Sequence, residues 1–378
     1  MFKERLDRIK DRITQISGQD YTPVPLSLEW ALVVLSRLYG LGVGFRLWLY
    51  QKKILRQGAL PCFVVSIGNI VAGGTGKTPM TLYTAELLKK IGKKPVVVSR
   101  GYGGSYKEDS LVVFDGGHVF SSPDECGDEP FMMAARRLCP VVVGKDRLRA
   151  GMRALDSLEP RPEAVVLDDG FQHIRLKRDL DILLFDFNRP LGNTRLLPAG
   201  RLRERPQSSG KRADALVFTR CPEENASRTQ MEAVLRFYPD RPFFKTVHQP
   251  YILRWIKKEK KSPDPGSDLA ALKGRTAVLF SGLADNRAFY ASMAEHGINI
   301  LYHLEFNDHH RYKTADFLTI NRMAVEKKAD LILTTEKDGV KIDKTIEWAA
   351  DVLVIGIRIR FEDPEKFEDF LVSKMEKK

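Results

Sequence analysis

Residues 66–79 read SIGNIVAGGTGKTP, with three closely spaced glycines followed by a lysine and a threonine. A β-rich apolar run, Phe63–Ile67, precedes this stretch, and a helical pattern follows it from about Pro79 to Ile91. Glycines let backbone N–H groups converge on phosphate oxygens without obstruction by side chains, and the N-terminus of a helix favours negative charge. The stretch therefore predicts a phosphate-binding loop between a strand and a helix.

Two side chains of this loop have specific expected roles. Lys77 is expected to reach the β- and γ-phosphates of a nucleotide, and the hydroxyl of Thr78 to bind Mg²⁺. The strict pattern has a glycine five residues before Gly76, where this chain has Val71, so an ordinary glycine-rich turn is the alternative. The flanking strand and helix favour the nucleotide loop. The residues expected to bind the nucleotide are Val71, Ala72, Gly73, Gly74, Thr75, Gly76, Lys77 and Thr78.

A second strand ends in two adjacent carboxylates. In EAVVLDDGFQH, residues 163–173, an apolar run leads directly into Asp168 and Asp169. Parallel sheets place ligands at their strand ends, and in phosphate-loop enzymes an acidic residue at such a position holds Mg²⁺. The alternative is that the two aspartates only cap the next turn. Together with the loop, the pair predicts nucleoside triphosphate chemistry.

Short apolar runs alternate with helical segments, which predicts an α/β fold with a mostly parallel sheet covered on both faces. In the first part of the chain the further expected strands are Pro95–Ser99, Val141–Gly144, Ala164–Leu167, Ile182–Phe185 and Ala215–Thr219. After residue 275 they are Ala277–Phe280, Ile298–Tyr302, Leu331–Thr334 and Val352–Ile357. We therefore expect a phosphate-loop domain over 55–240 and a smaller α/β domain over 241–378 that closes over the site.

Residues 238–275 carry several prolines and predict a break between the two domains. Within this break, residues 257–268 combine a run of lysines with SPDPG. We interpret them as a solvated loop or a hairpin tip, because no aromatic residue is interleaved with the lysines as a nucleic-acid patch would require.

The N-terminal residues 1–54 predict a separate, membrane-associating segment. Apolar residues at helical spacing over 2–17 indicate an amphipathic helix, and Leu28–Tyr50 is strongly apolar and near the length of a membrane span. Arg37 and Arg46 interrupt it, and Trp48 lies near its end, so we expect the helix to lie in the headgroup region rather than to span. A buried core helix is the alternative.

Composition sets weaker limits. The chain has 378 residues and a formal charge of +12, which suits nucleic acid, an anionic membrane, an anionic substrate or simple solubility. The four cysteines form no CxxC pair, so neither a zinc site nor a disulfide framework is expected. We instead expect the protein to work in a reducing cytoplasm. Residues 1–20 lack the pattern of a cleavable signal peptide.

Several further segments resemble those of the tetraacyldisaccharide 4'-kinase family, and they occur in the family's order from about Leu28 to Ile357. The most specific is LDDGFQH (167–173). The others are AGGTGKTP (72–79), SRGY (99–102), GDEP (127–130), LPAGRLRE (197–204), FSGLADN (280–286), FNDHH (306–310) and TTEKD (334–338). The family phosphorylates the 4'-hydroxyl of a tetraacylated glucosamine disaccharide 1-phosphate in lipid A synthesis. Residues 1–25 and 257–268 look like additions.

The resemblance implies roles for five further residues. Asp128 of GDEP would be the base that takes the proton of the sugar hydroxyl, and His309 would assist it. Glu129 would help to hold Mg²⁺, and Arg100 and Arg203 would contact phosphate. The alternatives are a helix-capping role for Asp128 and an ordinary surface position for His309.

The other histidines are expected to be structural. His173 is interpreted as ordering the loop after the two aspartates rather than as catalytic. The remaining four, which carry no spacing signal, are His118, His248, His296 and His303.

The resemblance also implies the partners: ATP and Mg²⁺ as cofactors, an acylated disaccharide lipid, and the cytoplasmic face of a bacterial inner membrane. We expect neither nucleic acid nor an obligate protein partner. One alternative is a membrane-associated ATPase or GTPase switch, but a base-specificity motif such as NKxD is missing after the carboxylate strand. The other is a non-enzymatic nucleic-acid or lipid-binding module, which would leave the loop, the aspartate pair and GDEP unexplained.

Overall fold

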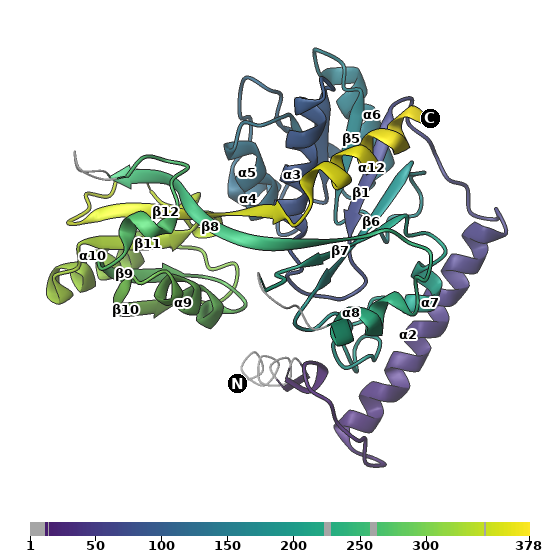
Figure 1. Cartoon of the computed structure of the whole chain (residues 1–378), viewed down its shortest axis with the longest axis horizontal. Helices are drawn as coiled ribbons and strands as arrows, with labels where there is room; N and C mark the ends of the chain where they lie inside the picture. Colours follow the sequence, from purple (N-terminus) through teal and green to yellow (C-terminus); the bar gives the residue numbers. More distant parts are fainter. Residues whose placement is uncertain (1–11, 14, 223–227, 258–262, 344) are drawn as a thin grey trace.

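The computed structural model describes residues 12–13, 15–222, 228–257, 263–343 and 345–378. These residues form two lobes joined by long strands (Figure 1). The amphipathic helix expected over 2–17 lies mostly outside the described residues, as do the lysines at 258–261.

The first lobe is a mostly parallel sheet with helices on both faces. Its central strands are rich in valine and leucine and buried along their whole length, as a sheet covered on both sides requires. Its strands are β1 (Phe63–Gly68), β2 (Pro95–Ser99), β3 (Ser110–Phe114), β4 (Val141–Gly144), β5 (Ala164–Asp168), β6 (Leu180–Asp186) and β7 (Ala215–Thr219). Its helices are α3 (Lys77–Lys90), α4 (Pro123–Cys126), α5 (Asp128–Ala135), α6 (Arg147–Ser157), α7 (Pro206–Ser209) and α8 (Arg228–Leu235).

The second lobe continues the sheet with smaller strands and its own apolar core. Its core is built around Phe280, Phe317 and Leu333, which are buried between the strands and their covering helices. The strands are β9 (Thr276–Ser281), β10 (Asn299–Glu305), β11 (Leu331–Thr335) and β12 (Asp351–Phe361). The helices are η1 (Leu269–Leu272), α9 (Asn286–Glu295), α10 (Thr314–Lys327) and α11 (Glu336–Gly339). The expected α/β class is confirmed, and only β3 and one connecting strand were not expected.

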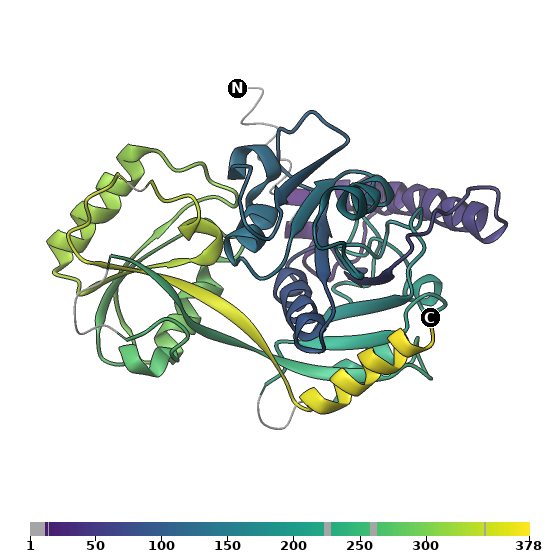
Figure 2. The same ribbon diagram turned by 90° about the horizontal axis from the view of Figure 1, so that it is seen from above.

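That connecting strand, β8 (Phe243–Lys257), lies within the predicted break over 238–275, so this part of the break is a regular strand. The strand starts parallel to β7 through residue 245 and then runs antiparallel to β12, so the two form a ribbon between the lobes (Figure 2). Pro250 lies beyond the part of β8 that pairs with β7. A proline is tolerated where a strand lacks a neighbour on one side, which is why this proline does not end the strand.

The complete sheet has the order β10-β9-β11-β12-β8-β7-β6-β1-β5-β2-β4-β3. All neighbours are parallel except β12 with β8 and β3 with β4. β1 and β5 lie side by side, with Ile67 opposite Asp168. The loop after β1 and the aspartates after β5 therefore leave the same edge of the sheet together.

The last helix, α12 (Pro364–Glu376), returns to the first lobe, as the yellow helix in Figure 2 shows. Phe367 and Leu371 are fully buried in the core that also contains Met80 of α3. Lys374 forms an ion pair with Asp214. The expected second domain over 241–378 therefore remains a proposal. Its last helix, α12, packs against the first lobe.

Helix α2 (Leu28–Gln51) extends along the outside of the first lobe (Figure 1). Within the described part of the chain it is the one helix that is long and apolar enough to cross a membrane by length and composition. Only Leu32 and Ser36 of this helix are buried, so the alternative of a buried core helix is wrong. The Ser36 hydroxyl donates a hydrogen bond to the carbonyl oxygen of Leu196 at 2.9 Å and so fixes the helix to the lobe.

Candidate active site

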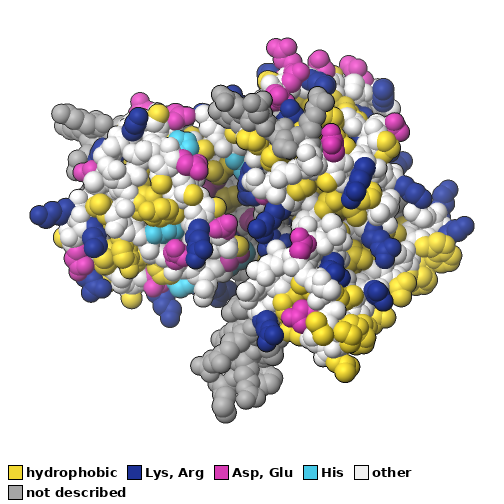
Figure 3. Space-filling view, turned by 60° about the horizontal axis from the view of Figure 1, so that its bottom comes forward, with side chains coloured by type: hydrophobic (Ala, Val, Ile, Leu, Met, Phe, Trp, Pro, Cys, Tyr) yellow, Lys and Arg dark blue, Asp and Glu magenta, His cyan; other side chains and the backbone are white. Residues whose placement is uncertain are grey.

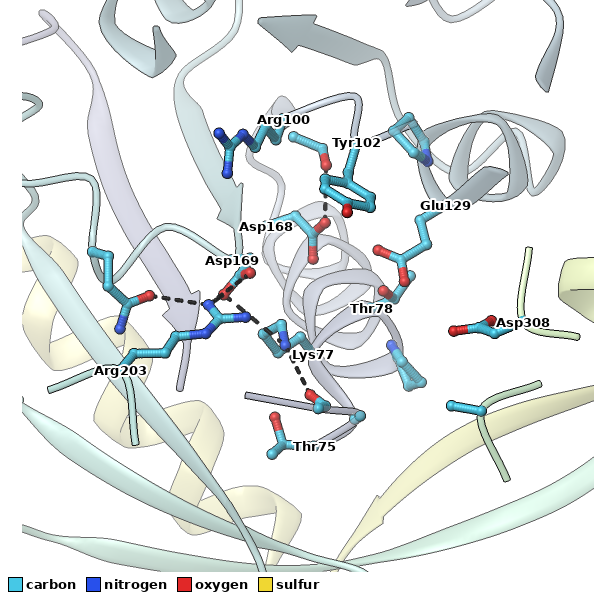
Figure 4. A pocket seen from close by; sticks show the side chains of 18 of the residues that line it. Thr75, Lys77, Thr78, Arg100, Tyr102, Glu129, Asp168, Asp169, Arg203 and Asp308 are labelled. Atoms are coloured by element: carbon cyan, nitrogen blue, oxygen red, sulfur yellow. Dashed lines mark hydrogen bonds and ion pairs between the residues drawn. The ribbon is translucent and has the colours of Figure 1, made fainter. Parts of the chain in front are cut away.

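A cleft of about 920 Å³ opens where the carboxyl ends of β1, β2 and β5 face the second lobe. It is visible as the hollow between the two lobes in Figure 3. One wall is the glycine-rich loop and the strand ends of the first lobe, seen from close by in Figure 4. The opposite wall comes from the second lobe and includes Asp308, His309 and Lys337. Helix α2 lines the mouth with Tyr39, Val43, Arg46 and Leu47.

The glycine-rich loop has the backbone geometry that its sequence requires. Gly73 and Gly76 have φ angles of 126° and 77°, in the left-handed range that side chains rarely adopt. A Cβ atom on Gly76 would also lie 2.6 Å from Nε2 of His248. Inside the loop, Nδ2 of Asn69 donates to the Thr75 hydroxyl at 2.7 Å. The loop thus turns tightly into the N-terminus of α3, where backbone N–H groups are free to bind an anion.

Val71 and Ala72, which we expected to bind the nucleotide, do not line the cleft. The side chain of Val71 is buried in the lobe's core, where the strict pattern would have a glycine. The backbone N–H of Ala72 donates to the carbonyl oxygen of Arg201 at 2.7 Å and is therefore already used. These two residues fix the loop to the segment around 201–203, and the phosphate-facing residues begin at Gly73.

The Lys77 side chain reaches from the first turn of α3 over the loop (Figure 4). Its Nζ donates to the carbonyl oxygen of Gly73 at 3.3 Å and lies 4.0 Å from Oδ1 of Asp169. Oδ1 and Oδ2 of Asp169 also accept from Nη1 of Arg203 at 2.8 and 2.9 Å. Burial opposes ionisation of Asp169, but Lys77 and Arg203 outweigh it and hold its pKa below the usual range.

Asp168 lies deeper than its neighbour. Its carboxylate accepts from the hydroxyls of Thr81 at 3.2 Å and Ser99 at 3.0 Å. Burial raises the pKa of Asp168 to about 6, and the nearby charges of Glu129 and Asp169 add to the shift. A buried carboxylate among other carboxylates is stabilised in its ionised form by a bound cation, as a magnesium site would supply.

The donor set fits Mg²⁺ only when phosphate oxygens complete it. Within the described residues, no group of three or more His, Cys, Asp or Glu side chains is arranged to hold a metal by itself. Thr78, Glu129, Asp168 and Asp169 all line the cleft. Mg²⁺ typically takes one or two carboxylates, several waters and the substrate's phosphates. These hard oxygen donors therefore suit a magnesium ion that arrives with a nucleotide.

Arg100 and Arg203 lie on the same side of the cleft, at the ends of β2 and of the 201–203 segment (Figure 4). Arg100 is exposed and lines the cleft, so its guanidinium can meet an anion that enters. Arg203 is held against Asp169, as described above, and its backbone N–H donates to the carbonyl oxygen of Ile70 at 2.7 Å.

Asp128 and His309 come together across the cleft from different lobes. Asp128 begins α5, and its Oδ2 lies 2.9 Å from Nδ1 of His309 and 2.7 Å from Nζ of Lys341. Although burial opposes it, the bonds from His309 and Lys341 hold the pKa of Asp128 below its usual range. Asp128 is thus an ionised carboxylate, bonded by two donors, next to Glu129 and His309, which both line the cleft.

A family model described as LpxK: Tetraacyldisaccharide-1-P 4'-kinase matches residues 28–376 of this sequence. The chain belongs to this family. A tetraacyldisaccharide 4'-kinase from Syntrophus aciditrophicus is 38% identical over 367 residues, which cover 94% of this chain and 95% of that protein. One from Geobacter sulfurreducens is 38% identical over 355 residues, covering 93% and 95%.

A solved structure of an LpxK from Aquifex aeolicus in complex with ATP, described as an "apo" form, has the same fold. Its TM-score is 0.71 at 33% identity, and the match covers 92% of this chain and all of that one. The expected fold class and the expected membership of the tetraacyldisaccharide 4'-kinase family are therefore confirmed.

Sequence reasoning missed several residues that support the site of this family member. Nη1 of Arg220 donates to the carbonyl oxygen of Gly74 at 2.9 Å. The Thr219 hydroxyl donates to the carbonyl oxygen of Thr75 at 3.1 Å. His248 packs against Gly76. Lys341 touches Asp128. Only their position after a strand or near a family-like segment could have marked them, and that signal is weak.

His173 has the structural role expected of it. Its Nε2 accepts the backbone N–H of Arg147 at 3.1 Å, so the ring ties the loop after β5 to the start of α6. Burial lowers the pKa of His173 to about 4, which keeps this nitrogen free to accept. His303 likewise bonds the hydroxyl of Ser281 at 2.8 Å inside the second lobe.

Proposed function

We propose that this chain transfers the γ-phosphoryl group of ATP to the 4'-hydroxyl of a tetraacylated glucosamine disaccharide 1-phosphate. The observation that carries the proposal is a phosphate loop and two strand-end aspartates beside a carboxylate–histidine pair, in which Asp128 of the first lobe bonds His309 of the facing wall. A phosphoryl donor and a hydroxyl acceptor both need to lie between these walls. The family membership supports the same reaction.

In this mechanism the first lobe holds ATP. The backbone N–H groups of residues 73–78 bind the β- and γ-phosphates, and Lys77 neutralises charge that develops on them. Thr78, Glu129, Asp168 and Asp169 would hold Mg²⁺, which supplies further charge neutralisation when bound. Arg100 contacts phosphate at the open side of the cleft. Arg203 keeps Asp169 in place through its guanidinium bond.

The base comes from the first lobe and is held by the facing wall. Asp128 accepts the proton of the sugar hydroxyl while that oxygen attacks the γ-phosphorus, because a neutral hydroxyl is a poor nucleophile. His309 orients the carboxylate through the bond to Oδ2. The reaction as proposed needs only ATP, Mg²⁺ and the lipid, and neither nucleic acid nor a second protein.

We also propose that α2 seats the protein on the cytoplasmic face of the inner membrane. The exposed apolar side chains of the helix support this, and Figure 3 shows apolar residues along the edge that α2 forms. The most exposed are Leu35, Leu38, Leu41 and Phe45. Since the neighbouring face of α2 lines the cleft, acyl chains can stay in the bilayer while the sugar reaches the site.

The decisive experiment is a transfer assay with labelled ATP and tetraacyldisaccharide 1-phosphate in mixed micelles. We expect label in the lipid only when both this acceptor and Mg²⁺ are present. ATP hydrolysis that proceeds at the same rate without the lipid would instead indicate an ATPase switch. For the membrane seat, Leu41→Ser/Phe45→Ser should reduce sedimentation with vesicles of phosphatidylethanolamine and phosphatidylglycerol, while Leu318→Ser on the second lobe should not.

A further inference from the structure

Lys341 connects the two lobes at the carboxylate proposed as the base. It lies two residues beyond α11, and its side chain is only 10% exposed. Its Nζ lies 2.7 Å from Oδ2 of Asp128 in the first lobe. The same Nζ donates to the carbonyl oxygen of His310 at 3.2 Å in the second lobe. One ammonium group thus binds both the carboxylate and the loop that carries His309.

The two oxygens of Asp128 have different environments. Oδ2 receives both Nδ1 of His309 and Nζ of Lys341. Among the described residues, none of the hydrogen bonds or ion pairs of Asp128 ends on Oδ1. Because two donors hold Oδ2, the carboxylate cannot rotate freely, and the position of Oδ1 is fixed as well. Oδ1 is therefore the oxygen that is available to an acceptor hydroxyl.

The loop that carries His309 needs such a fixed point. His309 has a φ angle of 60°, in the left-handed range that is unusual for a side chain of this size. Non-glycine residues stay in this range only where surrounding contacts hold them. The bond from Lys341 to the carbonyl oxygen of His310 is one of these contacts, and Lys337 adds another by bonding Asp308 at 2.5 Å.

Lys341 is itself held in place by its neighbours. Glu336, at the start of α11, accepts from Nη2 of Arg136 at 2.8 Å, and Arg136 is the residue that ends α5. Arg254 of β8 donates to the carbonyl oxygen of Gly339 at 2.9 Å. The segment 336–341 therefore contacts both ends of α5, with Glu336 at its end and Lys341 at its first residue.

We propose that Lys341 is a positioning residue for phosphoryl transfer, which orients Asp128 and the His309 loop relative to each other. This inference rests on the proposed role of Asp128 as the base. As the bond between the sugar oxygen and the γ-phosphorus forms, the bond from that phosphorus to the bridging oxygen of ADP breaks. The hydroxyl proton moves to Oδ1 of Asp128. Lys341 keeps its own protons throughout and acts only by fixing Oδ2.

The test compares three variants of the full chain in the lipid transfer assay. Lys341→Met keeps the length of the side chain but removes its charge and its donors, and we expect kcat to fall about 10- to 100-fold, as small misplacements of a reacting group do. The KM for ATP should change by no more than about twofold, because the first lobe alone holds the nucleotide. Lys341→Arg should recover most of the lost kcat, since a guanidinium can bond both Oδ2 of Asp128 and the carbonyl oxygen of His310. Lys327→Met, on an exposed part of α10, is the matched control.

Three outcomes would overturn the proposal: a Lys341→Met enzyme with wild-type kcat, a loss that lies in the KM for ATP, or no recovery with arginine. If Lys341→Met does not fold, Lys341→Gln is measured and interpreted by the same criteria. Asp128→Asn separates this inference from the proposed function. An inactive Asp128→Asn beside a fully active Lys341→Met refutes only the role of Lys341, whereas an active Asp128→Asn refutes the base and the positioning role together.

Discussion

The two walls of the cleft differ in how they are built. The first-lobe wall consists of a loop and two strand ends that leave one sheet edge together, and its residues are deeply set, with Asp168 3% and Thr75 4% exposed. The second-lobe wall consists of side chains from several separate segments, and His309 and Asp308 are 41% and 40% exposed. Its geometry depends on bonds to the first lobe, above all those to Asp128 and Arg136.

This difference predicts how the two walls respond to mutation. Sheet hydrogen bonds and a packed core hold the first wall, so a substitution there should remove a chemical group without moving its neighbours. The second wall is held by a few charged contacts, so loss of one contact should misplace the others. The first wall should therefore show losses of function confined to one group, and the second should show coupled losses.

The largest effect is expected at Lys77. Lys77→Ala removes the cation nearest to the transferred phosphoryl group, so kcat should fall by about 10³-fold or more, a typical cost for losing such a charge. The fold should persist, because the Lys77 side chain lines the cleft and is not part of the apolar core. The transfer assay and circular dichroism measure the two properties. Lys93→Ala, just after α3, is the control and should be fully active. A Lys77→Ala enzyme of normal rate would refute the nucleotide assignment of the loop.

A smaller and coupled effect is expected at His309. His309→Gln keeps a donor near Oδ2 of Asp128, whereas His309→Ala removes it, so kcat should fall by about 10-fold and about 100-fold respectively. A double-mutant cycle of His309→Ala with Lys341→Met measures the coupling, because both bond the same oxygen. We expect the double variant to lose much less than the product of the two single losses. Strictly multiplicative losses would contradict the idea of a shared oxygen.

The sequence reveals the first wall better than the second for the same physical reason. The loop residues and the two aspartates are contiguous with the strands that place them, so a strand pattern followed by GGTGKT or by DD already predicts their location. Asp128 and His309 lie far apart in the sequence, and only the family resemblance connected them. Nothing in the residues around Lys341 indicates that a lysine there contacts GDEP.

The errors have local causes. Val71 replaced a glycine of the strict pattern, and from sequence its place in the loop suggested phosphate binding, but its side chain packs in the core. β8 was interpreted as a break because three prolines lie in or near it, although the ribbon leaves one side of the strand unpaired where Pro250 occurs. The return of α12 to the first lobe follows from tertiary packing of Phe367, which periodicity alone cannot locate.

A third prediction concerns acid stability of the first wall. Burial lowers the pKa of His173 to about 4 and that of His248 to about 3, both below the usual 6.5. Between these values and pH 6.5 the unfolded chain binds protons that the folded chain does not, so unfolding becomes easier as the pH falls through this window. The free energy of unfolding in urea should therefore be highest above pH 6.5 and should decline towards pH 4.

The matched variant for this prediction is His173→Gln. Glutamine can still accept the N–H of Arg147 but does not titrate, so the decline between pH 6.5 and 4 should become shallower than in the wild type. His118→Gln, which removes an exposed histidine, is the control. An unchanged slope in His173→Gln would show that the folded protein admits a proton at this position, and that the first wall is less tightly packed than its contacts indicate.

The smallest effect is expected at Tyr21, where the N-terminal segment contacts the loop that leads into the first wall. The hydroxyl of Tyr21 donates to the carbonyl oxygen of Ala199 at 3.0 Å, and the guanidinium of Arg195 stacks over its ring at 4.9 Å. The loop that carries Ala199 continues into the 201–203 segment that pairs with the glycine-rich loop. Tyr21 lies before residue 28, where the match to the family model begins.

Tyr21→Phe removes the hydroxyl but keeps the ring, so the free energy of unfolding should fall by about 0.5–1.5 kcal/mol, the usual net value of one hydrogen bond. If the wall is held mainly by the sheet, the KM for ATP should stay unchanged, because Arg203 and Asp169 keep their own bonds. Tyr290→Phe, an exposed tyrosine on the second lobe, is the control and should leave stability unchanged. A rise in the KM for ATP in Tyr21→Phe alone would show that the first wall also depends on a few distant contacts. The contrast between the two walls would then be one of degree.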